Sequence, residues 1–162
     1  MPQADDYAHE LAESAQKSEI TVAVAESLTS GRISATLGAA PNSSDWFRGG
    51  LVAYSTEVKR TVLGVPDVPV VSQTAAEAMA TGVRRLLKAV VAVAVTGAGG
   101  PDPQDGQPPG SVWFAIATER GVHAWHRQFD GEPADVVEQT VTCATETLLD
   151  TVRSLTRDGS PS

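Results

Sequence analysis

Apolar side chains recur every three or four residues in three stretches of the chain. This period places them on one face of an α-helix, so each stretch is predicted to be an amphipathic helix. Hydroxyl groups at Ser72 and Thr74 can cap the middle helix, and Thr74 forms a capping box with Glu77. The predicted helices are residues 5–17, 72–89 and 133–155.

Strands are predicted where apolar residues are continuous or alternate with polar ones. Residues 20–25 and 90–96 are almost wholly apolar, and the second run is expected at the centre of a sheet, covered on both faces. Residues 111–118 and 122–129 alternate on either side of a polar turn, which predicts a hairpin. A shorter strand is expected at residues 51–54, where a pair of glycines has ended a short helix.

Helices that alternate with strands, followed by a late hairpin, predict an α/β fold. We expect a single three-layer α/β/α domain around a mixed central sheet. The length of 162 residues fits one domain, and no internal repeat or linker divides the sequence. The domain is expected to span residues 1–157, and residues 158–162 are expected to form a disordered tail.

Charge and composition argue against several functional classes. The formal net charge of −8 repels phosphate backbones, and the densest basic group, Arg84, Arg85 and Lys88, is too small a patch for nucleic acid. No apolar run approaches the ~18 residues of a membrane span. His123 and His126 lie three apart on a predicted strand, so they point to opposite faces and cannot chelate one metal. We therefore expect no nucleic-acid partner, no membrane and no metal.

Cysteine usage and the first residues indicate the cytoplasm as the compartment. The single cysteine, Cys143, cannot form a disulfide within the chain and fits a reducing environment. Carboxylates such as Asp5 and Glu10 give the start of the chain the wrong chemistry for a signal peptide.

Two predicted strands end in loops of small and polar residues. Ligands bind at the carboxyl ends of strands in open α/β sheets, and small residues let backbone amides approach them. Neither loop has the spacing of a nucleotide-binding motif, and both can also be ordinary loops. The candidate substrate-binding residues are Ser27, Thr29 and Gly31 in the first loop and Thr96, Gly97 and Gly99 in the second.

A second group of reactive side chains suggests a serine hydrolase that works without histidine. Ser44 can be a nucleophile if a base removes its proton, Lys59 can be that base when burial keeps it neutral, and Tyr54 can relay or orient the proton. The alternative interpretation is structural, with Ser44 as a helix cap, Tyr54 as a core aromatic and Lys59 as a surface charge. Spacing leaves both open, and Ser27 is a further candidate nucleophile.

Several segments, in family order along the chain, together resemble the CinA C-terminal domain family, whose enzymatic members are nicotinamide-nucleotide amidases. Each segment is weak evidence alone, but the set is specific and covers about residues 5–155. The segments are residues 25–31 (AESLTSG), 43–50 (SSDWFRGG), 52–59 (VAYSTEVK), 63–65 (LGV), 71–72 (VS), 94–101 (AVTGAGGP) and 110–115 (GSVWFA).

The resemblance implies hydrolysis of the carboxamide of nicotinamide mononucleotide to nicotinate mononucleotide and ammonia, in pyridine-nucleotide salvage. It implies no metal or cofactor. It assigns catalysis to Ser44, Tyr54 and Lys59, and it places Ser27 and Thr96 in the pocket wall. We also expect a homo-oligomer, with a dimer favoured.

One position departs from the family pattern in a way that concerns the substrate. Family enzymes commonly carry an arginine shortly after the glycine at Gly131, suited to the substrate phosphate, and Pro133 stands in its place. Arg32, Arg48 and Arg127 are candidates to replace it. The departure keeps two alternatives open: an amidase with a different or unphosphorylated substrate, and a non-catalytic nucleotide-binding module.

Overall fold

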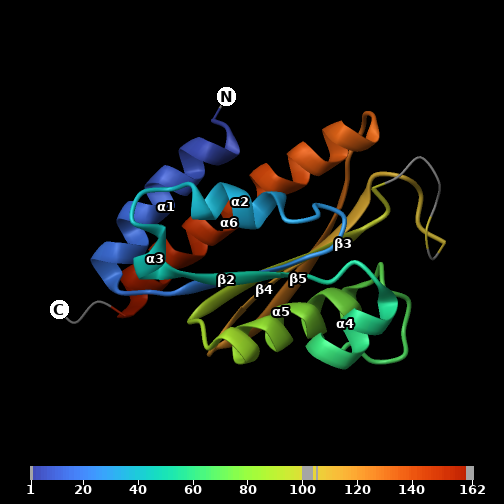
Figure 1. Ribbon diagram of the computed structural model, residues 1–162, viewed down its shortest axis with the longest axis horizontal. Coiled ribbons are helices and arrows are strands. Elements are labelled where there is room, and N and C mark those ends of the chain that lie inside the picture. The colour runs from blue at the N-terminus through green and yellow to red at the C-terminus, as the bar shows by residue number, and fades with distance from the viewer. Residues whose placement is uncertain (1, 100–103, 105, 160–162) are drawn as a thin grey trace.

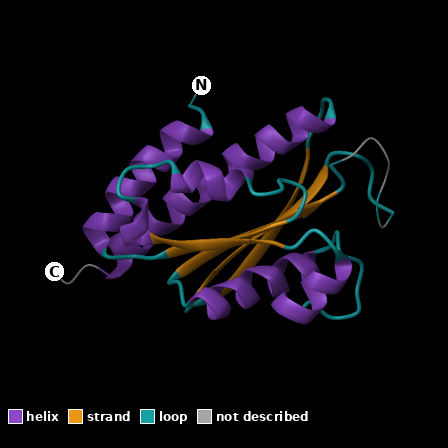
Figure 2. Cartoon of the chain, in the orientation of Figure 1, coloured by secondary structure: helices purple, strands orange, loops and turns teal. Residues whose placement is uncertain are grey.

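The computed structural model describes residues 2–99, 104 and 106–159. A five-stranded sheet in the order β2-β1-β3-β4-β5 forms the middle layer, and helices cover both of its faces (Figures 1 and 2). The strands are β1 (Val22–Glu26), β2 (Phe47–Val52), β3 (Val91–Gly97), β4 (Ser111–Thr118) and β5 (Gly121–Gln128). One face carries α1 (Ala4–Ser18), α2 (Arg32–Gly38), α3 (Ser43–Trp46) and α6 (Pro133–Gly159), and the other carries α4 (Thr56–Leu63) and α5 (Gln73–Leu87).

The sheet is mixed, as predicted. β1 pairs in parallel with both β2 and β3, whereas β4 and β5 form an antiparallel hairpin beside β3. The predicted three-layer α/β/α domain is therefore confirmed. Because β1, β2 and β3 run in the same direction, the loops that follow them all lie at the side of the sheet where these strands have their carboxyl ends. In the described residues, no helix is long and apolar enough to cross a membrane.

Alternation of valine and alanine in the central strands divides the core into two halves. The valines of β1 and β3 point to the face covered by α1 and α6, where Leu11 and Leu148 are buried among them. The alanines point to the opposite face, where Met79 and Ala80 of α5 pack. The small alanine side chains let α5 lie close to the sheet, and the larger valines fill the space under α6.

β2 begins earlier than predicted. Its first residue is Phe47, and it includes Gly49 and Gly50, which the sequence pattern had assigned to the end of a helix. Glycine is rare inside strands, but here the backbone lies against a neighbouring side chain: a Cβ on Gly50 would overlap Ser34 Oγ of α2. Gly50 therefore permits close packing of α2 on β2, whereas Gly49 has a φ of 143°, in the region that favours glycine.

Two helix ends refine the prediction. Of the two predicted caps of α5, Ser72 is the one that acts, and its Oγ accepts a hydrogen bond of 3.2 Å from the Ala75 N–H. α6 runs to Gly159, so its last turn includes the first two residues of the predicted disordered tail. The remaining residues of that tail, 160–162, lie outside the described residues.

The buried carboxylate of Glu26 ties the end of β1 to the start of α2. One oxygen accepts hydrogen bonds from Thr29 Oγ1 (2.6 Å) and the Ile33 N–H (2.9 Å), and the other accepts from the N–H (2.8 Å) and Oγ (2.6 Å) of Ser34. Two of these donors are N–H groups of the first turn of α2, which lack partners within the helix. The Glu26 carbonyl also accepts from the Ala53 N–H at 2.8 Å, so the chain that follows β2 is held by the same residue.

Replacing this carboxylate should weaken the fold. Glu26→Gln is expected to lower the free energy of unfolding by about 3 kcal/mol, because an amide has one acceptor oxygen and turns its own donors toward the donors around it. Urea unfolding measures the change. Glu57→Gln, at an exposed position of α4, is the matched control and should alter stability by less than about 0.5 kcal/mol. Equal stability of Glu26→Gln and the wild type would contradict this role of Glu26.

Candidate active site

A cavity of about 260 Å³ opens at the carboxyl ends of the parallel strands. Its walls come from the loops that follow β1, β2 and β3 and from the first turns of α6. The lining residues are Ser27, Leu28, Tyr54, Gly97, Gly99, Gln104, Pro133 and Val137. Three larger hollows lie elsewhere among the described residues, two between β5 and α6 and one beside Glu19 and Asp45, and none of them is lined by a residue predicted to be catalytic.

Ser27 lies in this cavity directly after the residue that anchors its loop. Ser27 is only 8% exposed, and the hydrogen bonds of Glu26 hold the backbone on either side of it. The Ser27 carbonyl accepts from the Ser30 N–H at 3.1 Å, which closes a tight turn. Ser30 itself has a φ of 50°, in the left-handed region. The serine hydroxyl is thus presented by a rigid turn at a strand end.

Tyr54 reaches the same cavity from the junction between β2 and α4, and Lys59 of α4 contacts its backbone. Tyr54 lines the wall and is 67% exposed, whereas Lys59 is only 2% exposed. Lys59 Nζ donates a hydrogen bond of 3.2 Å to the backbone carbonyl of Tyr54. Ser55 caps α4 by accepting from the Val58 N–H at 3.1 Å, which fixes the direction of the helix that carries the lysine. Lys59 is therefore a buried amine beside a tyrosine that lines the cavity, and not the surface charge of the alternative interpretation.

Ser44 does not join them within one chain. It is an exposed residue of α3, which precedes β2, whereas Tyr54 follows β2. The strand between them is six residues long and spans about 17 Å. Figure 1 shows α3 and α4 at opposite ends of β2. Within one chain the structure therefore does not bring Ser44 together with Tyr54 and Lys59, because an extended strand separates them, and a catalytic role for Ser44 stays a prediction.

The six predicted substrate-binding residues divide into two groups. Ser27, Gly97 and Gly99 line the cavity. The other three hold the loops that form it. Thr29 Oγ1 donates to Glu26, Thr96 Oγ1 donates to the Val70 carbonyl at 2.7 Å, and Gly31 takes a left-handed φ of 100° before α2. Contact of these three residues with substrate stays a prediction, but each of them helps to fix the conformation of its loop.

Sequence reasoning missed part of the cavity wall. Leu28 and Val137 supply apolar surface, and Gln104 supplies an amide. The sequence could have indicated Val137, since it lies one turn after Pro133 on the apolar side of a predicted helix. It could not have indicated Gln104, because that residue lies in a loop without periodicity.

The cavity wall is electrically neutral among the residues described. Pro133 lines it, so the position that departs from the family pattern does belong to this site. The three arginines considered as replacements, Arg32, Arg48 and Arg127, are not among the described lining residues. Arg48, for example, donates to the Leu87 carbonyl at 2.9 Å, far from the carboxyl ends of the strands. Over the described part of the chain, no three His, Cys, Asp or Glu residues come together as metal ligands.

Comparison with known proteins places the chain in a family. The family model described as CinA C-terminal domain matches residues 4–152. Nicotinamide-nucleotide amidohydrolase PncC from Pseudomonas putida is 40% identical over 145 residues, which cover 86% of this chain and 91% of that protein. A CinA-like protein from Solibacter usitatus is 39% identical over 144 residues, and this chain spans only 34% of its length.

Solved structures agree with this placement. The competence or damage-inducible protein from Enterobacter asburiae has a TM-score of 0.90 and 28% identity, with 94% of this chain and 99% of that chain covered. A CinA superfamily protein from Klebsiella pneumoniae has a TM-score of 0.89 and 30% identity, with 94% and 99% covered. The chain therefore belongs to the CinA C-terminal domain family.

Proposed function

We propose that this chain is an amidohydrolase that cleaves the carboxamide of a nicotinamide nucleotide, releasing ammonia and leaving the nicotinate nucleotide. The observation that carries the proposal is the meeting of Ser27 and Tyr54 in one cavity, with the amine of Lys59 against the Tyr54 backbone. The name of the Pseudomonas putida relative, which matches over most of its length, supports the substrate class.

Ser27, rather than Ser44, is the proposed nucleophile. A serine hydroxyl needs a neighbouring base at neutral pH, and Lys59 is the candidate base beside this cavity. Removing an ammonium group from water costs free energy, so burial of Lys59 favours the neutral amine that a base requires. Tyr54, at the cavity wall, orients the proton as it passes between serine and lysine.

The reaction then proceeds in two halves. Ser27 Oγ adds to the carboxamide carbon while its proton passes to Lys59, and the C–N bond breaks as that proton is returned to the departing nitrogen, which leaves as ammonia. Water, deprotonated by the same amine, then adds to the acyl carbon, and the bond to Ser27 Oγ breaks as Lys59 returns the proton to that oxygen, which releases the nicotinate product and restores the free enzyme. Backbone amides of the surrounding loops are suited to stabilise the tetrahedral oxyanion, which usually contributes a large part of catalysis.

The cavity suits the pyridine carboxamide end of the substrate. Leu28 and Val137 offer apolar contacts to an aromatic ring, and Tyr54 at the rim can cover its face. At about 260 Å³ the cavity is at the small end for ligand sites, so the ribose and phosphate are expected to extend out of it toward solvent.

Replacing Ser27 and Ser44 with alanine, one at a time, tests which serine is the nucleophile. Ser27→Ala is expected to lower kcat for ammonia release from nicotinamide mononucleotide by at least about a thousandfold, because the acyl-enzyme can no longer form. Ser44→Ala is the matched control and should keep wild-type turnover if the reaction occurs within one chain.

Two results would overturn this assignment. Wild-type turnover by Ser27→Ala would remove it as nucleophile, and loss of turnover in Ser44→Ala alone would return that role to Ser44. Saturable nucleotide binding by the wild-type protein without any ammonia release would instead support a non-catalytic module.

A second candidate is an amidase of the same mechanism for an unphosphorylated substrate. It is favoured by the neutral wall, in which Pro133 occupies the position where the family resemblance places a phosphate-binding arginine. A phosphate group in this site would lack a charged partner among the described lining residues.

Restoring the arginine distinguishes the two substrates. Pro133→Arg is expected to raise kcat/KM for nicotinamide mononucleotide about tenfold relative to the riboside, because a guanidinium adds charge-assisted hydrogen bonds to the phosphate. Pro133→Gln controls for loss of the proline at the start of α6. If the wild type already prefers the mononucleotide and Pro133→Arg changes nothing, phosphate recognition does not depend on this position.

A further inference from the structure

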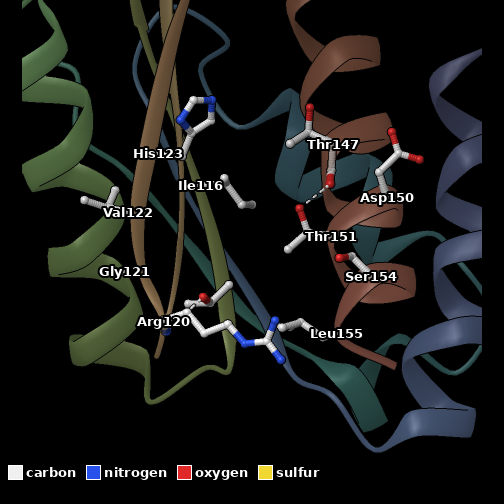
Figure 3. A pocket seen from close by; sticks show the side chains of 11 residues that line it. Ile116, Arg120, Gly121, Val122, His123, Thr147, Asp150, Thr151, Ser154 and Leu155 are labelled. Atoms are coloured by element: carbon white, nitrogen blue, oxygen red, sulfur yellow. Dashed lines mark hydrogen bonds between the residues drawn. The ribbon is translucent and has the colours of Figure 1, made fainter. Parts of the chain in front are cut away.

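Ser111 and His126 form a hydrogen-bonded pair that the proposed reaction does not use. Ser111 is the first residue of β4 and is fully buried, and its Oγ lies 2.7 Å from Nε2 of His126 on β5. The His126 ring also packs on Trp113, with ring centroids 5.3 Å apart, on the face of the sheet that α5 covers. His123, three residues earlier, lies on the other face beside α6 (Figure 3), as the spacing of the two histidines predicts. The serine and the tryptophan therefore hold the His126 ring in one orientation.

The same serine contacts the loop that follows β3. Ser111 Oγ donates a hydrogen bond of 3.0 Å to the side-chain oxygen Oε1 of Gln107. A serine hydroxyl has a single proton, so the hydrogen between Ser111 and His126 must come from Nε2 of the imidazole. The hydrogen bonds therefore run in one direction, from His126 through Ser111 to Gln107. We call these three side chains the His126 network.

Gln107 connects this network to the cavity. Its N–H and carbonyl form reciprocal backbone hydrogen bonds with Gln104, at 2.8 and 3.0 Å. Gln104 lines the cavity and is exposed, so it lies at the rim. Closer to the sheet, the backbone holds the loop, since the Gly110 N–H donates to the Ala98 carbonyl at 2.8 Å. The His126 network extends this support outward to the part of the loop that forms the cavity wall.

We propose that His126 and Ser111 are positioning residues that hold Gln104 against the ribose of the substrate. The inference rests on the proposed function, in which the pyridine ring enters the cavity and the ribose extends out past its rim. A carboxamide side chain has two donor hydrogens and one acceptor oxygen, which match the hydroxyl pair of a ribose. Gln104 is then a residue that selects a nucleotide over free nicotinamide. His126 is not among the described lining residues, so it acts through the loop.

Support from the sheet matters because Gln104 has little structure of its own around it. Gln104 and Gln107 lie outside the helices and strands. A glutamine side chain loses much rotamer freedom when it binds a ligand, and an unordered backbone would add to that cost. Fixing the backbone of Gln104 before the substrate arrives removes part of the cost and so strengthens binding.

Two substitutions of His126 separate the hydrogen bond from the packing of the ring. His126→Phe keeps an aromatic ring beside Trp113 but has no donor, whereas His126→Gln places an amide N–H near the position of Nε2. His126→Phe is expected to raise the Kd for nicotinate mononucleotide, the product of the proposed reaction, about fivefold, and His126→Gln should keep it within about twofold of the wild type. The KM for nicotinamide mononucleotide should rise with this Kd while kcat stays unchanged, because the ribose contact binds substrate and transition state alike.

Replacing Gln104 tests the contact itself. Gln104→Met is expected to raise the same Kd about tenfold, because hydrogen bonds to the ribose are lost. In the Gln104→Met background, His126→Phe should have almost no further effect, since the His126 network acts through Gln104. The matched control is His123→Phe, which replaces a histidine on the other face of β5 and should bind as the wild type does. Isothermal titration calorimetry measures each Kd, ammonia release gives KM and kcat, and circular dichroism checks that each variant is folded.

The contrary results differ from one another. Equal losses of affinity in His126→Phe and His126→Gln would assign the effect to the ring and reject the hydrogen bond. Wild-type affinity in Gln104→Met, additive losses in the double variant, or a wild-type protein that does not bind nicotinate mononucleotide would each overturn the inference. If the wild type binds this nucleotide but releases no ammonia from nicotinamide mononucleotide, the proposed reaction fails, and the Kd values alone still decide the role of His126.

Discussion

The site depends on the hydrogen bonds that the carboxylate of Glu26 accepts. It gathers four donors from the loop and helix that follow β1, and its backbone carbonyl holds the chain that follows β2. Ser27 is its neighbour in sequence, and Tyr54 follows directly after the residue bound to its carbonyl. The two side chains that share the cavity are therefore positioned from one buried group. A charged anchor of this kind is stable only when every lone pair has a partner, and here both oxygens do.

Much of the fold follows from patterns that are visible in the sequence. The continuous apolar runs at residues 20–25 and 90–96 predicted buried strands, the second of them covered on both faces, and the hairpin and long helices were found near their predicted positions. β2 was predicted too short because Gly49 and Gly50 read as a helix end. Gly50 is needed because Ser34 approaches from α2, and Gly49 has a φ of 143° that few other residues adopt. A contact between elements such as that of Ser34 has no local signature.

The site shows the same limit more sharply. Small residues after two parallel strands predicted a site at the loops where the cavity lies, because the order of elements indicates the direction of these strands. The placement of Ser44 with Tyr54 and Lys59 rested instead on closeness in sequence and on the family resemblance. A strand of six residues places its two ends on opposite sides of the sheet, so Ser44 and Tyr54 are close in sequence but far apart in space. Ser27, which lies far upstream in the sequence, shares the cavity with Tyr54 instead.

α6 begins at the wall of the proposed catalytic cavity. Pro133 and Val137 line the cavity, whereas Asp135, Glu138 and Gln139, on the neighbouring side of the same turns, line a second hollow. A helix start is held only weakly by its own hydrogen bonds, because its first N–H groups lack partners within the helix. Here the Asp135 side chain strengthens it, since its Oδ2 accepts a hydrogen bond of 2.8 Å from the Glu132 N–H. This contact joins the chain before α6 to its first turn and so helps to fix one wall of the cavity.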